Sequence, residues 1–137
     1  MKPLLYLSAL AVLLIFAPGP CFALWGIAEV SRERAKELGI EVRAQPAGPN
    51  DVRVEMAFKA KGELKGFSRV DLRVGEGDKE VVAPLREERC EERVVVRFSA
   101  DRSRLDKTNL WIMVPGELGG TVYAVRVKDF VELPKGR

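Results

Sequence analysis

The sequence predicts an all-β fold, an antiparallel β-sandwich of about seven strands that follows a signal peptide and one short helix. Three observations lead to this prediction. An apolar leader begins the chain, the hydrophobic period changes from 3.6 to 2 near residue 40, and clusters of turn residues recur at short intervals after that point. Alternation with one apolar side favours antiparallel sheets with one solvated face over parallel βαβ units.

The leader, "MKPLLYLSALAVLLIFAPGP", has the composition of a secretory signal peptide. Lys2 supplies the positive charge, residues 4–16 form the apolar region, and the prolines and glycine that follow end any helix. The next three residues, "CFA" at 21–23, match the small-x-small cleavage pattern. We therefore expect cleavage between Ala23 and Leu24, which predicts an exported protein, periplasmic or extracellular.

Two alternatives would leave the protein tethered to a membrane. An uncleaved leader could anchor it through residues 4–16, although this run is shorter than the roughly 20 residues that span a bilayer. A lipidated Cys21 is the second alternative. Bacterial lipoprotein signals usually have a small residue directly before the cysteine and Leu three places before it, where this chain has Pro20 and Pro18. Cleavage is the prediction, with no integral membrane segment left behind.

The predicted organisation has one folded domain. Residues 1–23 are the signal peptide, 24–39 an N-terminal segment with a short helix, 40–134 the β-sandwich domain and 135–137 a C-terminal tail. Only Cys90 remains after cleavage, in the charged stretch "REERCEER", so we expect a free thiol at a hairpin and no internal disulfide. The stability of the domain must then come from its core.

The helix is predicted over "VSRERAKELGI" at residues 30–40. Ser31 is a natural N-cap, and Gly39 is the residue expected in the left-handed conformation after the last turn. Ile40 can then fold back onto Ala35. Because the helix has only two turns, it needs a larger element to pack on.

We predict strands where apolar and polar residues alternate along the sequence. Inward faces are expected from alternate residues of "DVRVEMAFKA", "SRVDLRVGEG" and "ERVVVRFSA", namely Val52, Val54, Met56, Phe58, Ala60, Val70, Leu72, Val74, Val94, Val96 and Phe98. "NLWIMVPG" and "TVYAVRVKDFVEL" give two more strands, and residues 40–44 and 80–85 two weaker ones. The segment "ADRSRLDKTNLW" is predicted to cross between the sheets, with Leu105 at the core edge, and "GELKG" and "GELGG" are predicted hairpin loops.

Strands of this number and spacing are typical of a sandwich of immunoglobulin or fibronectin type III kind. The Cys…Trp…Cys pattern of antibody domains is absent from the sequence, so the prediction concerns the architecture and no family.

The sequence has no histidine, which excludes His-based nucleophile arrangements and the usual His-based metal sites. We identify no catalytic, metal-binding or cofactor-binding residue, and "DRSRLD" lacks the glycine and terminal Glu of a calcium loop. The chain has 23 basic and 20 acidic side chains, and the leader holds one basic residue and no acidic one. This small positive excess argues against nucleic acid as a partner.

The candidate binding face lies in "LWIMV", residues 110–114, where both sides of the predicted strand are apolar. One side packs in the core. We expect Trp111 and Met113, on the other side, to be covered by the helix or by the segment around Trp25, or else to form an exposed patch with Trp25. Aromatic residues and Met are enriched at binding surfaces.

The resulting functional hypothesis is an exported, non-enzymatic interaction or accessory module that binds an unknown protein or glycan partner in the cell envelope. The alternative is a carbohydrate-binding module that stacks sugars on exposed aromatic rings; the candidates are Trp25, Phe67, Trp111 and Tyr123. An enzyme based on carboxylates or a Ser–Lys pair is the third hypothesis, and no motif in the sequence supports it.

Overall fold

The computed structural model describes residues 25–131 of the 137-residue chain. Within this range the chain forms nine strands, one α-helix and four short 3₁₀ helices. In chain order they are β1 (Trp25–Glu29), α2 (Arg32–Leu38), β2 (Glu41–Pro46), β3 (Asp51–Lys59), η2 (Gly62–Leu64), β4 (Arg69–Val74), η3 (Gly77–Lys79), β5 (Val81–Ala83), β6 (Arg86–Cys90), β7 (Arg93–Asp101), η4 (Arg102–Lys107), β8 (Thr108–Gly116), β9 (Gly119–Arg126) and η5 (Val127–Phe130).

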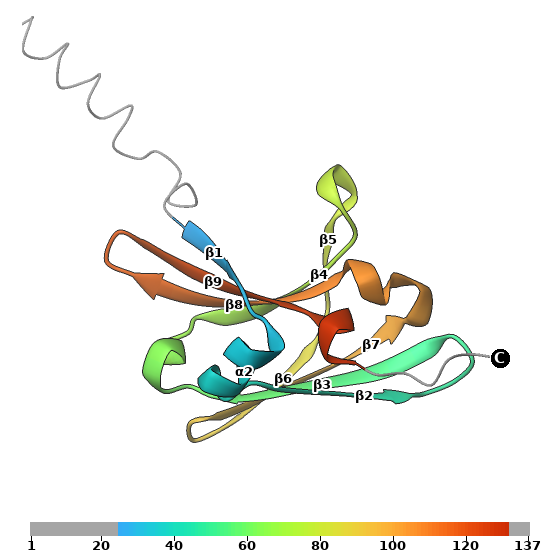
Figure 1. The fold of residues 1–137 in the computed structure, drawn as a ribbon, viewed down its shortest axis with the longest axis horizontal. Coiled ribbons are helices and arrows are strands. Elements are labelled where there is room, and N and C mark those ends of the chain that lie inside the picture. Colours follow the sequence, from blue (N-terminus) through green and yellow to red (C-terminus); the bar gives the residue numbers. More distant parts are fainter. Residues whose placement is uncertain (1–24, 132–137) are drawn as a thin grey trace, which may run out of the picture.

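The strands form two sheets that pack face to face, as the sequence predicts for a β-sandwich (Figure 1). The five-stranded sheet has the order β1-β9-β8-β4-β5, and the four-stranded sheet has the order β2-β3-β7-β6. All neighbouring strands are antiparallel except β1, which pairs with β9 in parallel. The architecture is therefore mostly β with two layers and one core between them.

The core contains the residues that the period of 2 assigns to the inner faces. In β3 and β7 the alternate apolar side chains are at most 8% exposed, and in β8 Leu110 and Ile112 are fully buried. Val70 and Leu72 of β4 are also buried, whereas Val74 and Ala60 are only partly buried. The predicted inner faces are confirmed because a sheet with one solvated side places every second residue in the same layer.

Helix α2 has the predicted caps. Ser31 Oγ accepts a hydrogen bond from the Arg34 N–H at 3.1 Å, and Gly39 has a left-handed backbone with φ of 74°. The Ile40 N–H then donates to the Ala35 carbonyl at 2.8 Å, so that both of these buried side chains join the core. The helix is thus packed against the sandwich, as its short length requires.

Four connections carry the chain from one sheet to the other, and two of them bear on the sequence predictions. The η4 segment joins β7 to β8 and buries Leu105, as predicted for a crossing at the core edge. The η2 segment, which contains most of "GELKG", joins β3 to β4 and so also crosses between sheets. The predicted hairpin at "GELKG" was wrong. Although its glycines are spaced much as in "GELGG", the segment connects strands of different sheets. "GELGG" is a hairpin, with Gly116 paired to Gly119 across β8 and β9.

Two strands were not predicted from the sequence. β1 comprises Trp25–Glu29, next to the helix, and is held by its pairing with β9. β6 comprises Arg86–Cys90, and all five of its residues are exposed, so no apolar alternation marks it. Its strand conformation comes from pairing with β7. The predicted strand at 80–85 is reduced to the three residues of β5.

The predicted leader, with its apolar run 4–16, Cys21 and the Ala23–Leu24 cleavage site, lies outside the described residues. Between residues 25 and 131, none of the helices is both long and apolar enough to cross a bilayer.

Candidate functional site

Trp25, Trp111 and Met113 lie on the same outer side of the five-stranded sheet. The strand register places three rows of side chains across β1, β9 and β8 on this side. These rows are Trp25–Gly120–Pro115, Ile27–Val122–Met113 and Glu29–Ala124–Trp111. The alignment of β1 with β8 cannot be read from the local sequence, because it depends on β9, which lies between them and comes about 90 residues after β1. We call this surface the outer tryptophan face.

The outer tryptophan face has its own small apolar cluster, separate from the core between the sheets. Met113 is 6% exposed and Val122 is 2% exposed, although both side chains point away from the main core. Ile27 lies beside Val122 on the edge strand and is 60% exposed. The apolar surface therefore extends from the buried Met113 and Val122 to the exposed Ile27 on β1.

Two arginines of β4 lie against the predicted binding residues. Arg73 Cζ is 3.8 Å from the centroid of the Trp111 ring, and its Nη1 forms an ion pair with Glu80 at 2.8 Å. The Arg69 Nε–H donates to Met113 Sδ at 3.3 Å. From the sequence, this side of β8 is either covered by the helix or the Trp25 segment or forms an exposed patch with Trp25. Helix α2 packs Ala35 in the core between the sheets, β1 with Trp25 lies on this side beside β9, and guanidinium groups lie on Trp111 and Met113.

A groove of about 520 Å³ opens at one end of the outer tryptophan face. Trp111, Ala124 and Ile27 line its apolar part. Its charged lining consists of three carboxylates and one guanidinium, from Glu29, Glu80, Asp129 and Arg126. Because Arg73 pairs with Glu80 and lies over the Trp111 ring, the groove keeps only a small excess of negative charge, which suits a cationic side chain.

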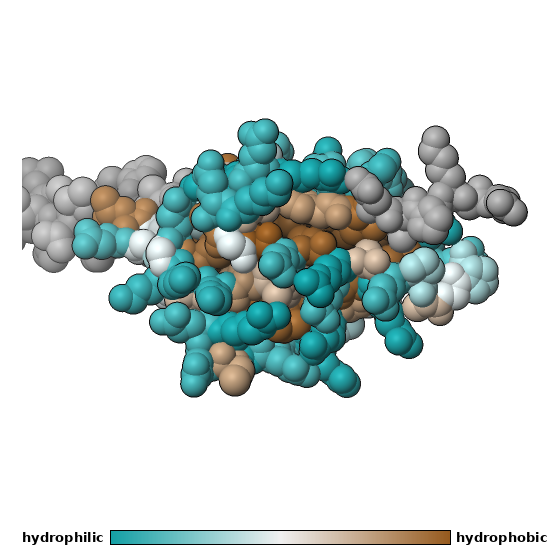
Figure 2. Space-filling view, turned by 60° about the horizontal axis from the view of Figure 1, so that its bottom comes forward, coloured by the Kyte–Doolittle hydropathy of each residue, from teal (hydrophilic) through white to brown (hydrophobic). Residues whose placement is uncertain are grey.

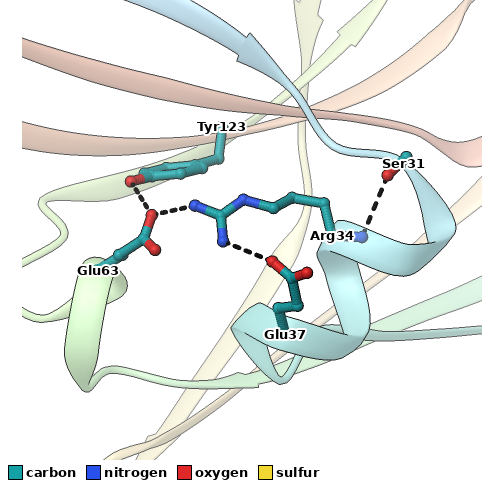
Figure 3. Close-up of polar contacts among 5 residues, drawn as sticks. All are labelled: Ser31, Arg34, Glu37, Glu63 and Tyr123. Atoms are coloured by element: carbon teal, nitrogen blue, oxygen red, sulfur yellow. Dashed lines mark hydrogen bonds and ion pairs between the residues drawn. The ribbon is translucent and has the colours of Figure 1, made fainter.

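A second polar cluster fixes helix α2 to the sandwich (Figure 3). Arg34 pairs with Glu37 at 3.0 Å on its own helix and with Glu63 of η2. The Tyr123 hydroxyl, which comes from β9, donates to Glu63 at 3.2 Å. Burial, and then the neighbouring Glu63 carboxylate, raises the pKa of Tyr123, so the phenol stays protonated and remains a donor. We interpret this cluster as a structural tie between three elements.

The remaining candidate residues lie elsewhere. Cys90 ends β6 beside a tight turn in which Glu91 has φ of 57°, and its thiol is free and exposed. Phe67 is buried, with Arg89 over its ring, so its face is occupied. Tyr123 is buried on the core side of β9, which leaves Trp25 and Trp111 as the candidates for a surface aromatic.

Three residues of the site, Ile27, Arg73 and Glu80, were not predicted from the sequence. Ile27 could have been found from its spacing of two from Trp25, had this segment been recognised as a strand. Arg73 and Glu80 meet because η3 folds the chain between β4 and β5, and no local pattern marks that approach.

Comparison of the chain with protein-family models, with curated proteins and with solved structures finds no significant match.

Proposed function

We propose that this protein is an exported, non-enzymatic β-sandwich module that binds a partner protein of the cell envelope through its outer tryptophan face. One observation carries the proposal: two tryptophans, a methionine and an exposed isoleucine from strands far apart in sequence form one apolar surface. Surfaces enriched in aromatic residues and Met, with a charged rim, are typical of protein interfaces.

The groove beside this surface suggests the chemistry of the partner. Glu29 contributes a carboxylate to the groove beside Trp111, whereas Glu80 is already paired with Arg73. A Lys or Arg of the partner would meet the negative charge of Glu29 next to the Arg73–Glu80 pair. An apolar residue of the partner would then cover Ile27, the exposed part of the cluster. We therefore propose a partner segment that presents an apolar side chain next to a basic one.

The absence of catalytic arrangements in the sequence supports a binding role. No histidine is present in the 137 residues, and no serine lies in a nucleophile-elbow sequence. A carbohydrate partner fits this surface less well, because Arg73 occupies a face of the Trp111 ring on which a sugar would stack. Protein recognition keeps that guanidinium in place, as part of the contact surface.

The test compares two surface variants as bait in a pull-down from cell-envelope extract. Ile27→Asp places a charge on the exposed rim of the outer tryptophan face, and Leu118→Asp places the same charge on the β8–β9 turn, where Leu118 is 83% exposed. The proposal predicts a partner that binds the wild type and Leu118→Asp equally and Ile27→Asp at least about tenfold more weakly. A Kd for the purified partner, measured by calorimetry, quantifies the difference.

A second variant tests the charge of the groove. Glu29→Lys reverses the charge beside Trp111 and should weaken the same partner, with a larger effect at low salt than at high salt. If every partner binds Ile27→Asp as tightly as it binds the wild type, the outer tryptophan face has no such role. Binding in a glycan array that Trp111→Ala abolishes would instead favour the carbohydrate hypothesis.

A further inference from the structure

Four arginines gather on the outer side of the other sheet. The register aligns Arg43, Glu55, Arg97 and Arg86 in one row across all four strands, and it places Arg53 in the next row, opposite Ser99. These side chains line a groove of about 500 Å³, in which Glu55 is the one carboxylate among four guanidinium groups. This side of the molecule carries β2 and β3 at the bottom of Figure 1 and comes forward in Figure 2, where hydrophilic side chains overlie an apolar band.

The carboxylates near this groove are already engaged by one arginine. Arg97 pairs with Glu55 at 3.1 Å and with Glu88 at 3.0 Å. Arg43 is within 3.7 Å of Glu41 at an exposed position, where an ion pair contributes little to stability. Arg53 and Arg86 form no ion pair with the residues that the structure describes. The guanidinium groups of Arg53 on β3 and Arg86 on β6 are therefore available as hydrogen-bond donors to a ligand.

The uncompensated charge of the groove lies on Arg53 and Arg86. Arg86 is the cross-strand neighbour of Arg97, whose own charge is compensated by Glu55 and Glu88. An anion that accepts hydrogen bonds from Arg53 and Arg86 would neutralise the remaining positive charge. The groove therefore favours a negatively charged occupant.

We propose that this groove, which we call the arginine groove, binds an extended acidic peptide segment of a partner protein, with Arg53 and Arg86 as its anchors. From the strand spacing and the rise per residue, their Cα atoms are about 12 Å apart. An extended peptide spans that distance in about four residues. Two carboxylates about four residues apart would then each accept a bidentate pair.

A peptide is favoured over other polyanions by the rest of the lining. The groove has one aromatic residue, Phe98, and its ring is directed into the core, so a glycan would find no ring to stack on. Nucleic acid requires a broad positive surface, whereas Glu41 and Glu88 lie in the row next to the arginines. An extended peptide that crosses β7 can place one carboxylate at Arg53 on β3 and another at Arg86 on β6.

The experiment measures binding of a fluorescein-labelled peptide of ten residues in which Glu and Ser alternate. The wild type should bind this peptide, and the double variant R53Q/R86Q should bind it about tenfold or more weakly, because charge-assisted hydrogen bonds are lost. The matched control K65Q/K79Q removes two positive charges from η2 and η3 loops outside the groove and should keep wild-type affinity. A peptide with Gln in place of Glu should not bind.

Three outcomes would overturn the proposal. They are no binding of the Glu–Ser peptide to the wild type, equal losses in R53Q/R86Q and K65Q/K79Q, and tight binding of a sulfated glycan in the absence of peptide binding. Ile27→Asp should bind the peptide like the wild type, because Ile27 belongs to the other sheet. The result is therefore independent of the function proposed for the outer tryptophan face. Circular dichroism of each variant separates lost binding from lost folding.

Discussion

At the scale of single residues, Gly120 makes the outer tryptophan face possible. A Cβ at this position would lie 2.7 Å from Cζ3 and 2.8 Å from Cη2 of Trp25, and 2.5 Å from the Val114 carbonyl oxygen. Real Cβ atoms essentially never approach so closely, so the indole must pack where Gly120 leaves room. The position of Trp25 on the sheet therefore depends on β9 having a glycine, which lacks a side chain, at position 120.

We predict that Gly120→Ala displaces Trp25 from the face. The added methyl group would contact both the Val114 carbonyl oxygen and the Trp25 ring, so the β8–β9 backbone must shift locally and the indole must move outward. In a Trp111→Phe background, where Trp25 is the only tryptophan, its fluorescence maximum should shift to longer wavelength as the ring enters water. Steady-state emission spectra at neutral pH measure the shift.

Gly26→Ala is the matched control, because a Cβ at Gly26 has no atom within 4 Å. This variant should keep the spectrum of its Trp111→Phe parent. An unchanged spectrum in Gly120→Ala would mean that Trp25 does not rest on Gly120.

At the scale of elements, the η4 segment depends on a charged cap. Asp101 Oδ1 accepts hydrogen bonds from the backbone N–H of Ser103 at 3.0 Å and from its hydroxyl at 2.9 Å. The backbone bond first, and then the hydroxyl bond, holds the pKa of Asp101 below its usual value of 3.8. The same segment inserts Leu105 at the core edge, so the cap orients a connection between the two sheets.

This cap predicts a specific dependence on pH. Because the pKa is lower in the folded state than in the unfolded chain, the stabilisation from ionised Asp101 is present above about pH 4 and is lost as the pH falls through the folded pKa. Wild type should therefore be more stable than Asp101→Asn near neutral pH, with the difference shrinking toward about pH 3. Urea unfolding at several pH values measures this difference. A difference that stays constant across that range would contradict the assignment.

Elements with their own local signals were predictable from the sequence. Helix α2 has a side-chain cap at Ser31 and a left-handed glycine at Gly39, and both act within one turn. β1 and β6 have no such signal. β6 has only exposed residues, and β1 pairs with a strand near the other end of the chain. Their conformations follow from partners that the local sequence does not reveal.

At the scale of the whole molecule, stability depends on the core between the sheets, because Cys90 is free and no disulfide joins the described residues. We predict that Ile112→Ala lowers the free energy of unfolding by about 2 to 5 kcal/mol, since Ile112 is fully buried in β8 and its truncation leaves a cavity. Chemical denaturation of the purified domain gives this value.

Leu118→Ala is the control for that measurement. Leu118 is 83% exposed in the β8–β9 turn, so its truncation should change the free energy of unfolding by less than about 0.5 kcal/mol. Similar losses in both variants would show that burial in the core does not determine stability here.

Local sequence patterns were enough to predict the two-layer β architecture, the inner faces of β3, β4, β7 and β8, the capped helix and the position of Leu105 at the core edge. Each of these follows from a period of 2, a cap or a turn, which act over a few residues. Trp111 and Met113 were also identified from the sequence, because both sides of β8 are apolar.

Which residues share a surface, in contrast, depends on how the strands are ordered and paired. Trp25 joins Trp111 through β9, and Arg43, Arg53, Arg86 and Arg97 meet across four strands. Register between strands distant in sequence is set by the packing of the whole core, and a shift of one residue would move every side chain to the opposite face. Both candidate binding surfaces are therefore properties of strand order and register, which the local sequence pattern does not contain.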